Sequence, residues 1–163
     1  MKKWLICICF VLFLTGCAAA ETFETVGDDL LQPVMAPIGE IMLELPSSAS
    51  RQTMISDEDG KLYFCDGYTV TVQTLNRGDL DRTARTLCGF GVSNLDIVET
   101  ASEGKKRWDW AWTAAGEGGD TVGRAAVIDD GHYHYCVTVM ANAADAGALD
   151  GQWTAMLRSF DIG

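Results

Sequence analysis

A β-hairpin is encoded at residues 62–72, where the chain reads Leu62-Tyr63-Phe64-Cys65-Asp66-Gly67-Tyr68-Thr69-Val70-Thr71-Val72. An Asp-Gly pair between two strand-forming runs is a strong signal for a two-residue hairpin turn. In the second run apolar and polar residues alternate, so that one face carries Tyr68, Val70, Val72 and Thr74 and the other carries Thr69, Thr71, Gln73 and Leu75. This period of two predicts a strand in a sheet.

A short helix is expected directly after this hairpin. Asp79 is a suitable N-cap, and Gly89 is a suitable residue to follow the last turn. Between them Leu80, Ala84 and Leu87 recur at helical spacing and form one apolar face. Before the hairpin, residues 38–45 are a further strand candidate.

The second half of the chain predicts a run of strands and a closing helix. Strand patterns cover residues 95–100, 107–114, 121–128 and 132–140, and glycine-containing turns separate them. The helix is expected from about Asp145 to Ser159, with an apolar stripe of Leu149, Trp153, Met156 and Phe160. Strands, a helix, more strands and a helix predict an α+β fold, an antiparallel β-sheet with helices packed on it.

This order of elements resembles the PsbP-type fold. The resemblance rests on Leu62-Tyr63 before the hairpin, on residues 68–72, and on a closing pattern of residues 133–140, Asp145, Trp153 and Ser159-Phe160. The family includes the photosystem II extrinsic protein PsbP and bacterial lipoproteins of the DcrB type, and the likeness covers roughly residues 38–162. It implies an α-β-α sandwich that serves as a non-catalytic accessory or binding module. It carries over no functional residue, since the matched pattern contains none.

The first seventeen residues have the features of an export signal. Two lysines precede an uncharged run over residues 4–14, which is shorter than the roughly 20 residues that cross a bilayer. The run closes on Leu14-Thr15-Gly16-Cys17, which resembles the lipobox of bacterial lipoproteins. The resemblance implies cleavage between Gly16 and Cys17 and lipid attachment to the Cys17 thiol. The expected organisation is a signal peptide (1–16), a lipidated cysteine with its tether (17–29) and a single α+β domain (30–163).

The charge of the chain restricts its partners. Without Lys2 and Lys3, which leave with the signal, 10 basic and 23 acidic side chains remain. Such an acidic chain is not expected to bind nucleic acid, which needs clustered lysine and arginine. It is also unsuited to electrostatic docking on anionic lipid, so the acyl chains must hold it to the bacterial cell membrane. The expected partners are therefore the membrane, through the lipid, and an envelope protein or a small ligand on the extracytoplasmic side.

Three cysteines remain in the exported domain, where oxidation is permitted: Cys65, Cys88 and Cys136. They allow one disulfide in three pairings, or three reduced thiols in the core. We predict Cys65–Cys88, because a helix packed back on its own hairpin would bring these two positions together. Cys136 would then be a free thiol.

Two further groups of residues are candidates for a functional site. Trp108, Trp110 and Trp112 share one face of a strand, either as core beneath the last helix, with Trp153 and Phe160 as partners, or as a groove for a flat ligand. His132, His134 and Cys136 also alternate on one strand and are residue types that bind zinc.

Catalysis is the less favoured function. Three positions on one strand spread over roughly 13 Å and cannot all reach one ion without a bend, so no metal and no other cofactor is expected. No nucleophile elbow, zinc-protease motif or paired carboxylate in an apolar setting is found in the sequence. A binding or accessory module is therefore the preferred function. A small metal-dependent hydrolase using the His132/His134 hairpin is the alternative.

Overall fold

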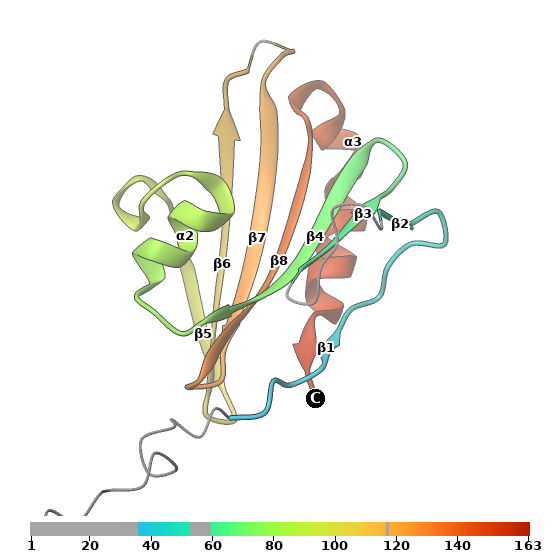
Figure 1. Cartoon of the computed structure of the whole chain (residues 1–163). Coiled ribbons are helices and arrows are strands. Elements are labelled where there is room, and N and C mark those ends of the chain that lie inside the picture. The colour runs from blue at the N-terminus through green and yellow to red at the C-terminus, as the bar shows by residue number, and fades with distance from the viewer. Residues whose placement is uncertain (1–35, 53–59, 117) are drawn as a thin grey trace, which may run out of the picture. The chain divides into compact units, whose positions relative to one another are not determined.

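The computed structural model describes residues 36–52, 60–116 and 118–163. The described part is a seven-stranded antiparallel sheet with a helix on each face and a separate pair of two-residue strands (Figure 1). The α+β fold class expected from the sequence is thereby confirmed. The signal, Cys17 and the tether up to residue 29 lie outside the described residues.

The sheet has the strand order β2-β3-β4-β8-β7-β6-β5, and every neighbouring pair is antiparallel. Its strands are β2 (Ser50–Gln52), β3 (Gly60–Phe64), β4 (Tyr68–Asn76), β5 (Val98–Ser102), β6 (Lys105–Ala114), β7 (Thr121–Asp129) and β8 (Tyr133–Asn142). The predicted strand over residues 38–45 is reduced to β1 (Ile41–Met42), which pairs with β9 (Asp161–Ile162). The short strand β2 had no clear signal in the sequence.

The predicted hairpin is formed by β3 and β4. Gly67 takes a positive φ of 81°, which glycine adopts without strain, and the Cys65 N–H donates to the Tyr68 carbonyl at 2.9 Å. The register places Tyr63 opposite Val70, so both side chains lie on the same face. The turn therefore sets which face of β4 carries its apolar residues.

Both helices begin at a capped residue. Helix α2 (Leu80–Cys88) has the predicted caps: the Asp79 carboxylate accepts from the Arg82 N–H at 2.7 Å, and Gly89 is left-handed. Helix α3 (Ala143–Ser159) begins two residues before the expected start, because the Asn142 side chain accepts from the Ala144 N–H at 3.0 Å. A short 3₁₀ turn, η2 (Val92–Asn94), follows α2.

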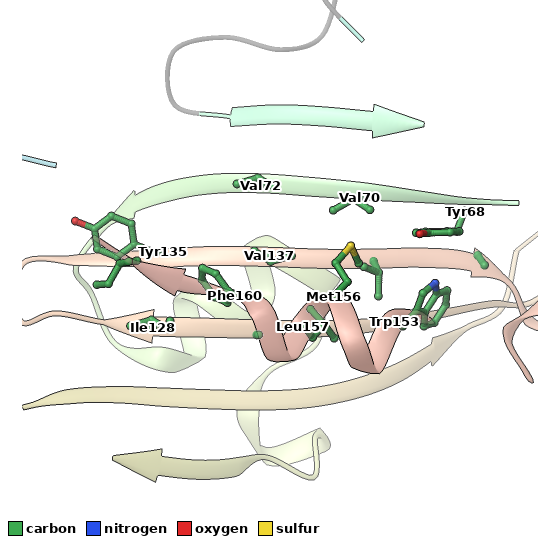
Figure 2. Close-up of a cluster of buried hydrophobic side chains, with 14 of the residues drawn as sticks. Tyr68, Val70, Val72, Ile128, Tyr135, Val137, Trp153, Met156, Leu157 and Phe160 are labelled. Carbon is green, nitrogen blue, oxygen red and sulfur yellow. The ribbon is translucent and has the colours of Figure 1, made fainter. Parts of the chain in front are cut away.

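The sheet separates two apolar cores. On one face α3 packs on β8 and β7, and Trp153, Met156, Leu157 and Phe160 meet the side chains of β4 and β8 (Figure 2). On the other face α2 and the segment after it cover Trp108, Trp110, Trp112, Val127 and Cys136. Strands β7 and β8 are buried on both faces, which explains their near-continuous apolar character.

Residues 36–45, which we call the strap, run beside the α3 core and are held by two tyrosine hydroxyls of β8. The Tyr133 hydroxyl donates to the Ala36 carbonyl at 2.7 Å, and the Tyr135 hydroxyl accepts from the Gly39 N–H at 2.8 Å. The Tyr135 hydroxyl also donates to Asp130 at 3.0 Å. Burial acts to raise the pKa of Asp130, but the hydrogen bonds from the Tyr133 and His132 N–H groups and from Tyr135 lower that pKa overall.

Candidate functional site

The side chains of the tryptophan stripe are buried in the core. Trp108, Trp110 and Trp112 are 8%, 4% and 7% exposed, respectively. The expectation that they lie beneath the last helix, against Trp153 and Phe160, is wrong: they lie under α2, while Trp153 and Phe160 belong to the core on the opposite face. The neighbouring strands β7 and β8 are apolar on both faces, so the alternation that identified the stripe does not say which helix covers it.

His134 is enclosed beneath α2. Its Nδ1 lies 2.7 Å from the Thr83 hydroxyl oxygen of α2, and its Nε2 lies 3.9 Å from the Asp129 carboxylate of β7. The ring is 1% exposed and packs edge-on against Trp108, and burial lowers the pKa of His134. These three polar groups resemble a nucleophile, a base and an orienting acid, but Thr83 is only 3% exposed. The arrangement fixes α2 on the sheet.

The predicted histidine site for a metal does not assemble. His132 is exposed in the turn before β8, whereas His134 and Cys136 point into the core under α2. Within the described ranges, no three His, Cys, Asp or Glu side chains are grouped as metal ligands would be. The hydrolase alternative therefore has no support from the geometry of this hairpin.

The cysteines differ from the predicted pairing. Cys65, Cys88 and Cys136 are all free. Cys65 packs against the α3 core, while Cys88 and Cys136 belong to the core under α2. The hairpin places Cys65 on one face of the sheet and α2 covers the other, so a Cys65–Cys88 bond would have to pass through the sheet. Burial raises the pKa of the Cys136 thiol strongly and that of Cys65 as well.

An open groove lies where α3 stops covering the sheet. The helix packs on β8 and β7 and leaves the same face of β6 and β5 uncovered, and the resulting hollow has a volume of about 570 Å³. We call it the edge groove. Its floor is formed by the strands and one wall by α3, through Asp96, Val98, Thr100, Arg107, Asp109, Trp110, Ala111, Arg124, Ala125, Thr154, Leu157 and Arg158.

Arg107 fixes the wall of the edge groove to its floor. Its guanidinium donates two hydrogen bonds of 2.8 Å to Asp109 and further bonds to the carbonyls of Leu157 (2.7 Å) and Phe160 (3.2 Å). These carbonyls belong to the C-terminal end of α3, where they lack partners within the helix. The guanidinium also lies over the Phe160 ring at 5.7 Å. Arg107 therefore has a structural task and few donors left for a ligand.

Arg124 and Arg158 have more donors to offer. One nitrogen of Arg124 donates to the Thr154 hydroxyl at 3.0 Å, and another forms an ion pair with Asp150. Arg158 follows Thr154 by one helical turn and is exposed. Across the described residues, no hydrogen bond or ion pair engages its guanidinium. The edge groove thus has an uncommitted cation on its helical wall.

The sequence contained a weak signal for this site. Arg107, Asp109 and Ala111 alternate with the tryptophans of β6, so they occupy the opposite face of that strand. A charged strand face opposite a buried one is expected to be exposed to solvent. The local sequence pattern does not show that residues 98, 124 and 158 lie close together. That juxtaposition depends on how far α3 extends across the sheet.

Comparison with known proteins supports the architecture. The solution structure of cyanobacterial PsbP (CyanoP) from Synechocystis sp. PCC 6803 superimposes with a TM-score of 0.51 at 9% identity, over 78% of this chain and 95% of that one. The fold is PsbP-like. This agrees with the resemblance drawn from the order and spacing of the elements.

Two other solved structures are similar at lower scores. LpqN of Mycobacterium tuberculosis, described as involved in cell envelope biogenesis, has a TM-score of 0.48 at 14% identity, over 77% of this chain and 84% of that one. A Pseudomonas aeruginosa protein of unknown function has a TM-score of 0.44 at 15% identity, over 76% and 83%. No protein-family model and no curated protein matches the sequence. In the part of this PsbP-like chain that is described, no helix is long and apolar enough to cross a membrane.

Proposed function

We propose that this chain is an exported bacterial lipoprotein whose PsbP-like domain is a non-catalytic binding module, with the edge groove as its binding site. The export and anchoring part of the proposal rests on the lipobox at residues 14–17 and on the short apolar run before it. Acyl chains at Cys17 would hold the domain on the extracytoplasmic side of the membrane, since two or more chains anchor stably. An envelope protein or a small ligand would then be its partner.

The edge groove is the observation that carries the binding function. Its volume of about 570 Å³ lies within the roughly 300–1,000 Å³ of small-molecule sites. Arg107 holds the groove walls in place before any ligand arrives, so little ordering is required on binding. The Thr83–His134 pair, which combines a hydroxyl with a base, is buried beneath α2.

Blocking the edge groove tests this function. The full chain in lipid nanodiscs is incubated with a small-molecule extract of its own cells and examined by native mass spectrometry. Ala111→Tyr fills the groove floor, and Ala101→Tyr places the same ring on the opposite face of the neighbouring strand; both alanines are exposed. We expect a bound mass with the wild type and with Ala101→Tyr, and none with Ala111→Tyr. Absence of any wild-type adduct, or its persistence in Ala111→Tyr, contradicts the assignment.

A further inference from the structure

The helical wall of the edge groove arranges donors for an anion. Asp150, Thr154 and Arg158 follow one another at intervals of four residues, so they form one stripe along α3. Arg124 reaches this stripe from β7 and bonds both Asp150 and Thr154. Thr154 therefore lies between two guanidiniums, and its hydroxyl oxygen already accepts from Arg124. Its own hydrogen can be donated to a ligand that also reaches Arg158.

One of the three arginines around this stripe has no ion-pair partner among the described residues. Arg107 is neutralised by Asp109, and Arg124 by Asp150. Arg158 has no such partner among the described residues, and the remaining carboxylate of the lining, Asp96, is exposed on the segment before β5. A singly charged anion matches one free guanidinium. A more highly charged ligand would meet stronger repulsion from a chain in which 23 acidic side chains face 10 basic ones once the signal is removed.

The floor of the edge groove suits an apolar group. Val98 lies on the sheet face that α3 leaves open. It is 62% exposed, the largest value among the exposed large hydrophobic side chains of the described residues. Ala111 is also exposed on the floor, and Leu157 of α3, which is 7% exposed, lines the groove as well. An apolar group laid on these residues would cover Val98.

We infer that the edge groove binds a monocarboxylate carried on an apolar group, an inference that rests on the proposed binding function. The carboxylate is held by Arg158, by the free donors of Arg124 and by the Thr154 hydroxyl, and the apolar group lies on Val98, Ala111 and Leu157. Arginine and carboxylate pair through two parallel hydrogen bonds, so the guanidinium selects for this planar anion.

The experiment compares a carboxylate with its neutral isostere. Binding of 3-phenylpropionate and 3-phenylpropionamide to the full chain in lipid nanodiscs is followed by ligand-observed NMR, with empty nanodiscs subtracted. We expect the acid to bind and the amide to bind at least tenfold more weakly. Arg158→Gln should weaken the acid at least tenfold. Arg82→Gln, on an exposed arginine of α2 on the opposite face, should leave its affinity unchanged.

A second pair of probes identifies the source of the carboxylate. The peptide N-acetyl-Val-Thr-Val is tested with a free carboxyl terminus and as its amide, to find out whether a peptide end is preferred to a small acid. A preference for the free terminus that depends on Arg158 also supports carboxylate binding at this site. Equal binding of acid and amide, or an acid that ignores Arg158→Gln, overturns the inference. If the extract gives an adduct that Ala111→Tyr abolishes while neither acid binds, the groove remains a binding site for another class of ligand.

Discussion

His134 shows how a single buried side chain makes stability depend on pH. Burial lowers the pKa of its ring, while Asp129 and Asp130 act to raise that pKa and Arg77 acts to lower it. An unfolded chain restores the ordinary value of about 6.5, so below that pH the unfolded state binds more protons than the folded one. Stability is therefore full above pH 6.5 and is lost as the pH falls below it.

We expect the free energy of unfolding of the wild type to fall between pH 7.5 and pH 5.5, by up to about 1.4 kcal/mol for each unit by which the pKa is depressed. His134→Gln can keep a hydrogen bond to Thr83 but does not titrate. Urea unfolding at both pH values gives the comparison. The variant should lose less stability on acidification than the wild type. Equal losses would show that His134 is not the group responsible.

Gly123 is a second position where one residue decides the packing. It lies opposite Trp112 in the β6–β7 register, and a Cβ at this position would lie less than 3.0 Å from the Trp112 ring. The indole therefore occupies the space that any other residue at 123 would need. The residues next to Gly123 in the sequence do not reveal this contact, because the Trp112 ring comes from the adjacent strand.

Gly123→Ala should lower the free energy of unfolding by about 1–3 kcal/mol through overpacking. The measurement is chemical denaturation of both single variants and of the double variant with Trp112→Leu. The smaller side chain at 112 gives the methyl group room, so the double variant should be more stable than the sum of the two losses predicts. Strict additivity of the two changes would contradict the close contact.

At the scale of elements, the attachment of α3 to β6 depends on Arg107. Its guanidinium reaches two carbonyls at the end of the helix and the Asp109 carboxylate on its own strand. The side chain is 25% exposed, which weakens these interactions relative to a fully buried site. No other described ion pair combines a carboxylate with helix-end carbonyls.

Arg107→Gln should cost roughly 2 kcal/mol, since hydrogen bonds from a charged donor contribute about 1.5–3 kcal/mol when well formed. Arg85→Gln is the matched control, because Arg85 pairs with Asp81 on the surface of α2, where solvent screens the pair and its contribution is small. Thermal and urea unfolding of both variants gives the comparison. If both variants lose similarly little stability, Arg107 is not the main attachment of α3.

The elements themselves were largely predictable from the sequence. The Asp66-Gly67 hairpin, the caps of α2 and the stripe of α3 are local signals, and each appears where it was expected. The side on which each helix lies was not predictable. Strand β8 buries Tyr135 and Val137 on one face and His134 and Cys136 on the other. Its alternation therefore separates the two faces but does not show which helix covers each of them.

At the scale of the whole molecule, the sheet separates Cys65 from Cys88 and Cys136. Cys65 lies with the α3 core and Cys88 with the core under α2. We expect all three mature thiols to react with iodoacetamide after unfolding without reductant. Without denaturant Cys136 should be the slowest, because it is fully buried and its thiol stays protonated. Peptide mapping under non-reducing conditions decides between free thiols and a disulfide. A disulfide-linked Cys65–Cys88 peptide would contradict the free thiols expected here.

The proposed anchor lies outside the described residues. Cys17→Ser should abolish incorporation of labelled palmitate and leave the protein uncleaved or released from the membrane, because the proposed lipid attachment requires the thiol. A conservative change elsewhere in the tether, Thr22→Ser, should leave labelling intact. Continued labelling of Cys17→Ser would refute the lipobox assignment.

The strap also decides how a pull on the chain reaches the domain. Backbone tension from the segment before Ala36 meets the Tyr133 and Tyr135 hydroxyl bonds first and the β1–β9 pair next. The long strands of the sheet bear load only after the strap has peeled away. If the chain is anchored as proposed, tension would detach residues 36–45 before it reaches β5, β6, β7 and α3, which form the edge groove.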